Sequence, residues 1–200
     1  MHEKHPIEEK SFQIMGERYD LSQFDDKALP IAQRVLHATA DIELVKSMLI
    51  DIEAVDKITD AIGSDMPLVC DVEMVRSAIA YKNTVCGLSQ ARNSRTIAPG
   101  NTLSQIAIEL ATHDLPPGFI AVIGCAPTAL FRLLDLIDSN QILPAAIIGM
   151  PVGFVGALES KLRLAKCSIA HITNSSERGG SAAAAAAFNA IYRLANSPQN

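Results

Sequence analysis

Short apolar stretches alternate along this chain with longer segments of helical period. The apolar stretches are rich in β-branched residues and show little polar alternation, which is typical of strands buried on both faces of a parallel sheet. We expect strands at Pro67–Cys70, Thr84–Leu88, Phe119–Ile123, Ala145–Ile148 and Ser168–Ile172. The pattern predicts an α/β fold with a mostly parallel sheet and helices on both faces.

Segments with an apolar residue at every third or fourth position predict the helices. They cover Lys27–Met48 with a break near Ala40, Asp71–Tyr81, Thr102–His113, Thr128–Ile137, Gly153–Ala165 and Ser181–Ala195. The alanine run 182–187 predicts a last helix that packs tightly against its neighbours. Residues 1–200 are expected to form a single domain, with residues 1–10 and 196–200 as flexible tails.

The charge balance argues against nucleic acid as a partner. The chain has 17 Lys and Arg against 22 Asp and Glu, a net charge of −5, and 4% of its residues are aromatic. A protein that binds the phosphate backbone usually carries a basic excess, and a base-stacking surface needs aromatic side chains.

Neither a membrane span nor an export signal is expected. The two long uncharged stretches, residues 115–131 and 139–158, are broken repeatedly by Pro and Gly. The first ten residues have mixed charge and no apolar run. The cysteines form no C-x-x-C pair, which favours reduced thiols in a cytoplasmic protein.

Three junctions, at residues 124–130, 149–156 and 176–181, place Gly or Pro where a strand should end and a helix begin. Such junctions would leave free backbone N–H groups and a partial positive charge facing a pocket. This arrangement suits carboxylates or phosphates, although ordinary tight turns give the same pattern. The chain lacks G-x-G-x-x-G and the P-loop motif, so nucleotide cofactors lose their main support.

His37 is the candidate acid/base residue. It lies in an apolar helical segment, and Asp41 would follow one turn later if the helix continued, close enough to hold the imidazole ring. A hydrogen-bonded core histidine is the alternative interpretation. Arg92 and Arg95 are expected in a polar loop, where they could clamp carboxylates or be solvated.

Two other polar groups each have two interpretations. Asp71 and Glu73 follow a predicted strand and are typical of a helix N-cap with a first-turn acid. Glu159, Ser160 and Lys161 interrupt an apolar segment, so they face either a pocket or partner chain, or solvent.

Five motifs together closely resemble the precorrin-8X methylmutase family, which acts late in cobalamin biosynthesis. They are HATAD at residues 37–41, CDVEMV at 70–75, APTAL at 126–130, PVGFVGALESK at 151–161 and GGSA at 179–182. The resemblance runs in order from Ser11 and Phe12 to the last helix, and PVGFVGALESK is highly specific.

The resemblance implies an isomerase, usually a homodimer, that moves a methyl group from ring carbon eleven to ring carbon twelve of precorrin-8X or cobalt-precorrin-8. The product is the corrinoid hydrogenobyrinate or cobyrinate. His37 matches the family's acid/base histidine, and such a shift needs no metal or cofactor, only the correct protonation state and a shaped site. The implied substrate-binding residues are Asp41, Arg92, Arg95, Thr102, Ser104, Ala126, Pro127, Thr128, Val152, Gly153, Glu159, Ser160, Lys161, Gly179, Gly180 and Ser181.

The chain departs from the family pattern at three places. Leu103 follows Thr102 where an arginine is usual, and Cys125 stands where an asparagine is usual. The usual basic approach to G-G-S is altered to SSER at residues 175–178. Arg92 or Arg95 could supply the missing charge. A corrinoid-binding paralogue without catalytic activity is therefore the alternative function, and an enzyme of Rossmann type acting on another small anion is a third, although the nucleotide fingerprint is absent.

Overall fold

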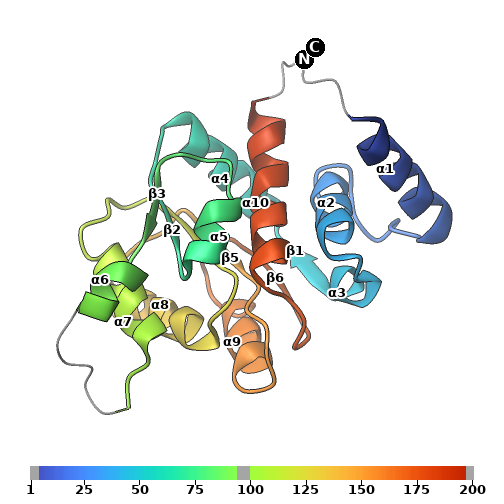
Figure 1. Cartoon of the computed structure of the whole chain (residues 1–200). Helices are drawn as coiled ribbons and strands as arrows, with labels where there is room; N and C mark the ends of the chain where they lie inside the picture. Colours follow the sequence, from blue (N-terminus) through green and yellow to red (C-terminus); the bar gives the residue numbers. More distant parts are fainter. Residues whose placement is uncertain (1–4, 94–99, 197–200) are drawn as a thin grey trace.

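The computed structural model describes residues 5–93 and 100–196 (Figure 1). Its strands form one sheet in the order β1-β6-β5-β4-β2-β3. All neighbouring strands are parallel except β1, which pairs antiparallel with β6. This arrangement confirms the predicted α/β class. The strands are β1 Met48–Ile50, β2 Leu68–Cys70, β3 Thr84–Cys86, β4 Ile120–Ile123, β5 Ala146–Gly149 and β6 His171–Asn174.

Helices cover both faces of the sheet, as predicted (Figure 1). The central strands are buried throughout, and successive residues contribute to opposite cores. Leu68 belongs to the core that contains Ile31, Ile58 and Phe188, whereas Val69 belongs to the core that contains Ile108, Leu130 and Leu164. The helices are α1 Pro6–Arg18, α2 Leu29–Thr39, α3 Ile42–Lys46, α4 Ile52–Gly63, α5 Glu73–Ala78, α6 Leu88–Asn93, α7 Leu103–Thr112, α8 Pro127–Asp138, α9 Ala157–Leu164 and α10 Ser181–Ala195.

The last helix, α10, lies at the centre of one layer. It packs against α2, α4 and α5, and residues 183–187 are all buried. Alanine has no side chain beyond Cβ, so neighbouring helices approach its axis closely. The predicted tight packing of the alanine run is confirmed.

Residues 40–63 differ from the prediction of one broken helix that continues to Met48. Ala40 adopts a left-handed conformation with φ 52°, which ends α2. The Asp41 side chain then accepts a hydrogen bond from a backbone N–H group of α3, and the Asp51 side chain accepts one from α4. The strand β1 lies between these two helices in the sequence. The strand β1 and the helix α4 are not among the predicted elements, since the prediction places no helix or strand between Met48 and Pro67.

The chain ends also differ from the prediction. Residues 6–10 belong to α1 rather than to a tail, and Glu8 docks this helix through ion pairs with Arg34 of α2 and Arg193 of α10. Asn196 follows α10, and the rest of the predicted C-terminal tail lies outside the described residues. Strand β6 extends to Asn174, two residues beyond the predicted end, because β1 pairs with that end.

The two uncharged stretches are each divided between a strand and a helix. Residues 115–131 contain β4 and the start of α8, and residues 139–158 contain β5 and the start of α9. Within the described ranges, no helix combines the length and hydropathy needed to cross a membrane.

Candidate functional site

The carboxyl ends of β2, β4, β5 and β6 lie at one edge of the sheet, because these strands are parallel. The antiparallel β1 begins at the same edge, where Met48 pairs with Asn174. In α/β proteins the loops that follow such strand ends form the ligand site. The predicted junctions therefore belong to one region of the molecule.

His37 lies near the end of α2, half-buried beneath α1. Its ring stacks on Phe12 with centroids 5.4 Å apart and planes 9° apart. Its Nδ1 lies 2.8 Å from the Ser11 hydroxyl oxygen. Its Nε2 makes no hydrogen bond to any described residue. One ring nitrogen is thus held by α1, and the other is available to a ligand.

A groove of about 350 Å³ separates α1 from α2, and His37 forms part of its wall. The lining is mostly apolar, with the cations Lys10 and Arg18 among the lining residues. A more open depression of about 530 Å³ is lined by residues 16–22, Phe24 and Leu29. It shares Arg18 and Tyr19 with this groove but contains no predicted site residue. The smaller groove is the candidate site, because His37 is among its lining residues.

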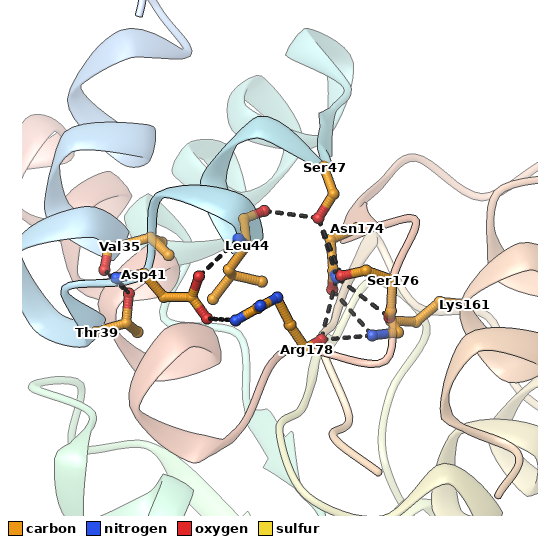
Figure 2. Close-up of polar contacts among 9 residues, drawn as sticks. All are labelled: Val35, Thr39, Asp41, Leu44, Ser47, Lys161, Asn174, Ser176 and Arg178. Carbon is orange, nitrogen blue, oxygen red and sulfur yellow. Dashed lines mark hydrogen bonds and ion pairs between the residues drawn. The ribbon is translucent and has the colours of Figure 1, made fainter. Parts of the chain in front are cut away.

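Asp41 does not hold the His37 ring, so that prediction is wrong. The left-handed Ala40 turns the chain away, and Asp41 instead accepts a hydrogen bond from the Leu44 N–H at 3.1 Å and pairs with Arg178 at 2.6 Å (Figure 2). Burial would raise the pKa of Asp41, but the Leu44 bond and the Arg178 guanidinium outweigh it and hold the pKa below its usual value. The Ser11 hydroxyl takes the expected place beside the ring.

The junction at residues 124–126 has no free N–H groups to offer, contrary to the prediction. The Asp71 carboxylate accepts hydrogen bonds from the N–H groups of Gly124 at 3.0 Å, Cys125 at 2.8 Å and Ala126 at 2.7 Å. Asp71 is fully buried, and burial raises the pKa of its carboxyl although the three bonds oppose the rise. The expected N-cap role is also wrong, because this side chain binds the neighbouring junction instead.

The other two junctions pack on each other. The Gly153 N–H donates to the Glu177 carbonyl at 3.1 Å, and the Gly180 N–H donates to the Met150 carbonyl at 2.8 Å. Gly179 has φ +152°, and a Cβ there would lie 2.3 Å from the Met150 oxygen, so only glycine fits. The N–H groups of Gly153 and Gly180 are thus already bound, whereas no side chain caps the first turn of α9 or α10.

The structure brings the predicted residues of α7 and α8 together. Thr102 caps α7 and donates its hydroxyl to the Thr128 hydroxyl at 2.9 Å. Ala126 and Pro127 begin α8, and Ser104 lies half-buried in the first turn of α7. The buried Ser181 lies next to this region, since a Cβ on Gly124 would be 3.0 Å from its Cα.

The remaining predicted residues are scattered. Arg92 is exposed in the last turn of α6 rather than in a loop, and Arg95 lies outside the described residues. Glu159 is exposed in the first turn of α9. Ser160 and Lys161 are fully buried, and Ser160 bonds within its own helix. Burial lowers the pKa of Lys161 to about 8, partly opposed by the charge of Glu177.

The sequence reasoning assigned no role to Ser11 or Phe12, although both contact the candidate histidine. The helix α1, which carries both residues, could have been predicted from the sequence. Pro6 followed by Glu8 and Glu9 is typical of the first turn of a helix. Arg178 was missed as well, because its partners are distant in sequence.

A family model described as precorrin-8X methylmutase matches residues 6–194 of the chain. The chain belongs to the precorrin-8X methylmutase family. This confirms the resemblance carried by the sequence motifs and makes the chain a member of an isomerase family.

Relatives within the precorrin-8X methylmutase family match over nearly their full length. A cobalt-precorrin-8 methylmutase of Priestia megaterium is 38% identical over 204 residues, covering 96% of this chain and 88% of the relative. A precorrin-8X methylmutase of a Sinorhizobium species is 37% identical, covering 94% and 93%. The crystal structure of the precorrin-8X methylmutase from Thermus thermophilus superposes with a TM-score of 0.84 at 31% identity, covering 94% of this chain and 95% of that one.

Proposed function

We propose that this chain moves a methyl group from ring carbon eleven to ring carbon twelve of precorrin-8X or cobalt-precorrin-8, with His37 as the acid/base residue. The observation that carries the proposal is the His37 ring, held at one nitrogen and available at the other, in the wall of a groove. Relatives named for precorrin-8X and for cobalt-precorrin-8 support this substrate class.

Ser11 suits an imidazole that changes its protonation state. A serine hydroxyl can both donate and accept a hydrogen bond, so it can partner Nδ1 whether or not that nitrogen carries a proton. The stacked Phe12 ring fixes the plane of the imidazole. Nε2 can therefore give or take one proton at the substrate without losing its orientation.

The groove suits part of the substrate. Its volume of about 350 Å³ is near the lower end of the roughly 300–1,000 Å³ typical of small-molecule pockets. A macrocycle with many acetate and propionate groups needs a larger contact surface than this groove provides. Lys10 and Arg18 in the groove lining suit its carboxylates. We propose further contacts with the Thr102–Thr128 pair and with the first turns of α9 and α10, which no side chain caps.

A second copy of the chain in a homodimer would supply additional contact surface for the substrate. The loop after β5 exposes Val152, Phe154 and Val155, and the Phe154 side chain is 96% exposed. Adjacent exposed apolar side chains mark an association surface. This loop contacts the 175–180 loop, which in turn contacts Asp41 through Arg178, so the surface adjoins the proposed site. Light scattering should give a dimer, and Phe154→Ser should shift it towards the monomer.

The reaction as proposed needs no resident cofactor, and cobalt, when present, is part of the substrate. We also propose a cytoplasmic location, which the four free cysteines favour.

Visible absorption spectroscopy tests the proposed reaction, because migration of the methyl group changes the conjugation of the macrocycle. Incubation with precorrin-8X or cobalt-precorrin-8 should convert the spectrum to that of the corrinoid product. His37→Ala should fold and lose this conversion, whereas the exposed His113→Ala should retain it. Conversion that survives in His37→Ala would contradict the assignment. Tight product binding without conversion by the wild type would favour the paralogue that lacks catalytic activity.

A further inference from the structure

Lys161 of α9 is buried completely and points into the loop between β6 and α10. Its Nζ donates to the Arg178 carbonyl at 2.6 Å and to the Asn174 side-chain oxygen at 3.2 Å. Neither acceptor carries a charge. A buried ammonium that bonds only uncharged acceptors is costly, and the charge of Glu177 offsets this cost only in part. The two hydrogen bonds from Nζ offset part of the cost of burying the charge. An apolar side chain at this position would not carry that cost.

The Lys161 bonds fix one end of a densely bonded turn. Asn174 donates to the Ser176 hydroxyl at 2.8 Å and to the same Arg178 carbonyl at 3.1 Å. The Ser176 hydroxyl lies 3.1 Å from the hydroxyl of Ser47, at the start of the antiparallel strand. The Arg178 carbonyl is therefore held by two donors, directly before the two glycines that lead into α10.

The same turn reaches the end of α2. Figure 2 shows Arg178 between Asp41 on one side and Lys161 on the other. The Arg178 guanidinium pairs with Asp41 at 2.6 Å, and Asp41 is four residues after His37. The 175–180 loop is thus attached to α9 through its backbone and to the α2–α3 corner through a side chain.

We propose that Lys161 is a positioning residue: by fixing residues 175–180 it sets where the N-terminus of α10 lies relative to His37. The inference rests on the proposed function and deepens it. Lys161 acts through the loop, not through the substrate, because its ammonium is buried and bonded to the protein. The sequence-based expectation of a direct substrate contact is replaced by this role.

Lys161→Met tests the inference, since methionine has similar length and no donor. We expect the turnover number to fall roughly ten- to a hundredfold, the range that follows from a displacement of about 1 Å near a reacting centre. Hydrogen exchange should accelerate in residues 175–181 and stay unchanged in β4 and β5. The exposed Lys166→Met, just beyond the end of α9, is the matched control and should leave turnover and exchange as in the wild type.

A double-mutant cycle with Asp41→Asn separates positioning from direct contact. Both residues act on one loop in this proposal, so their effects on turnover should be strongly non-additive. A direct contact between Lys161 and substrate would instead give additive losses, with product affinity reduced in Lys161→Met alone. Additive effects, or unchanged turnover despite a loosened loop, would overturn the inference.

A second variant keeps the test possible if Lys161→Met does not fold. Lys161→Gln retains a donor on a shorter side chain and should keep part of the turnover. Full wild-type turnover in Lys161→Gln, together with accelerated exchange in the loop, would overturn the inference. A wild-type protein that does not convert the substrate overturns the proposed function and this inference together. That result differs from an active wild type with an unaffected Lys161→Met, which overturns the inference alone.

Discussion

His37 and Asp71 both carry titratable side chains, but they differ in burial and in the number of their hydrogen-bond partners. Asp71 is fully buried and accepts three N–H bonds from the neighbouring junction. His37 is half-buried, has one hydroxyl partner, and forms part of a groove wall. The carboxylate has its hydrogen-bonding capacity filled by the protein, whereas the imidazole retains one nitrogen for a ligand.

The comparison shows that a polar side chain near the site can serve the fold, as Asp71 does, or remain available to a ligand, as His37 does. The residues 124–126 look like an anion site in the sequence, but the protein supplies its own anion there. Asp71 therefore shapes the edge of the site, and substitution should affect folding. His37 is free to act on a substrate, and substitution should affect turnover.

The largest expected effect is on stability, from Asp71→Ala. Removal of the carboxylate leaves three N–H groups without their acceptor. Because each buried donor left unsatisfied costs about 1–3 kcal/mol, we expect a total loss of about 3–5 kcal/mol. Urea denaturation should show a loss of this size in the free energy of unfolding, with a smaller loss for Asp71→Asn. The exposed Asp60→Ala is the control. A loss below about 1 kcal/mol would contradict the structural role of Asp71.

Ser11→Ala should lower the turnover number roughly tenfold, which corresponds to about 1.4 kcal/mol of lost orientation of the His37 ring. The free energy of unfolding should change by less than about 1 kcal/mol, because Ser11 is only half-buried. Ser11→Thr keeps the hydroxyl and should retain most of the turnover. Equal turnover in Ser11→Ala and the wild type would mean that the hydroxyl does not orient the ring.

Lys161 extends the comparison to a buried cation, through the pH dependence of stability. Its pKa of about 8 in the folded protein lies below the ordinary lysine value of about 10.4, so the unfolded chain binds more protons between these values. Stability therefore rises with pH in that window. Measured against Lys161→Met, the free energy of unfolding of the wild type should gain up to about 1.4 kcal/mol per pH unit between pH 8 and 10.4. A flat difference would show that Lys161 has an ordinary pKa.

The smallest effect concerns the docking of α1 over His37. Burial would raise the pKa of Glu8, but the bonds and charges of Arg34 and Arg193 hold it below its usual value. The stabilisation is present above the ordinary value of about 4.3 and is lost as pH falls through the lower folded-state pKa. Hydrogen-exchange protection of residues 6–18 should therefore fall below about pH 4, while α10 stays protected.

Glu8→Gln should reproduce that loss of protection in α1 at neutral pH. The adjacent Glu9→Gln is the matched control, since Glu9 is exposed and forms none of these ion pairs. Protection that is the same in both variants would show that the ion pairs do not dock the helix.

The sequence by itself determined the α/β class, the central strands and the packed C-terminal helix. Buried parallel strands must be apolar on both faces, and residues 119–123 and 145–148 have that composition. The alanine run carries the close packing of α10 in its own side chains. The motifs also placed the chain in its family, and they identified His37 as the candidate acid/base residue.

Only the tertiary structure decided the partners of these residues. Ser11 meets His37 across 26 positions, Asp71 meets residues 124–126 across more than 50, and Arg178 meets Asp41 across 137. Local periodicity carries no information on such pairs, since they depend on how elements pack after the strands have joined. A single left-handed residue, Ala40, was enough to turn Asp41 from the histidine to the arginine. Side-chain partners follow from the path of the backbone, and that path is fixed by the whole fold.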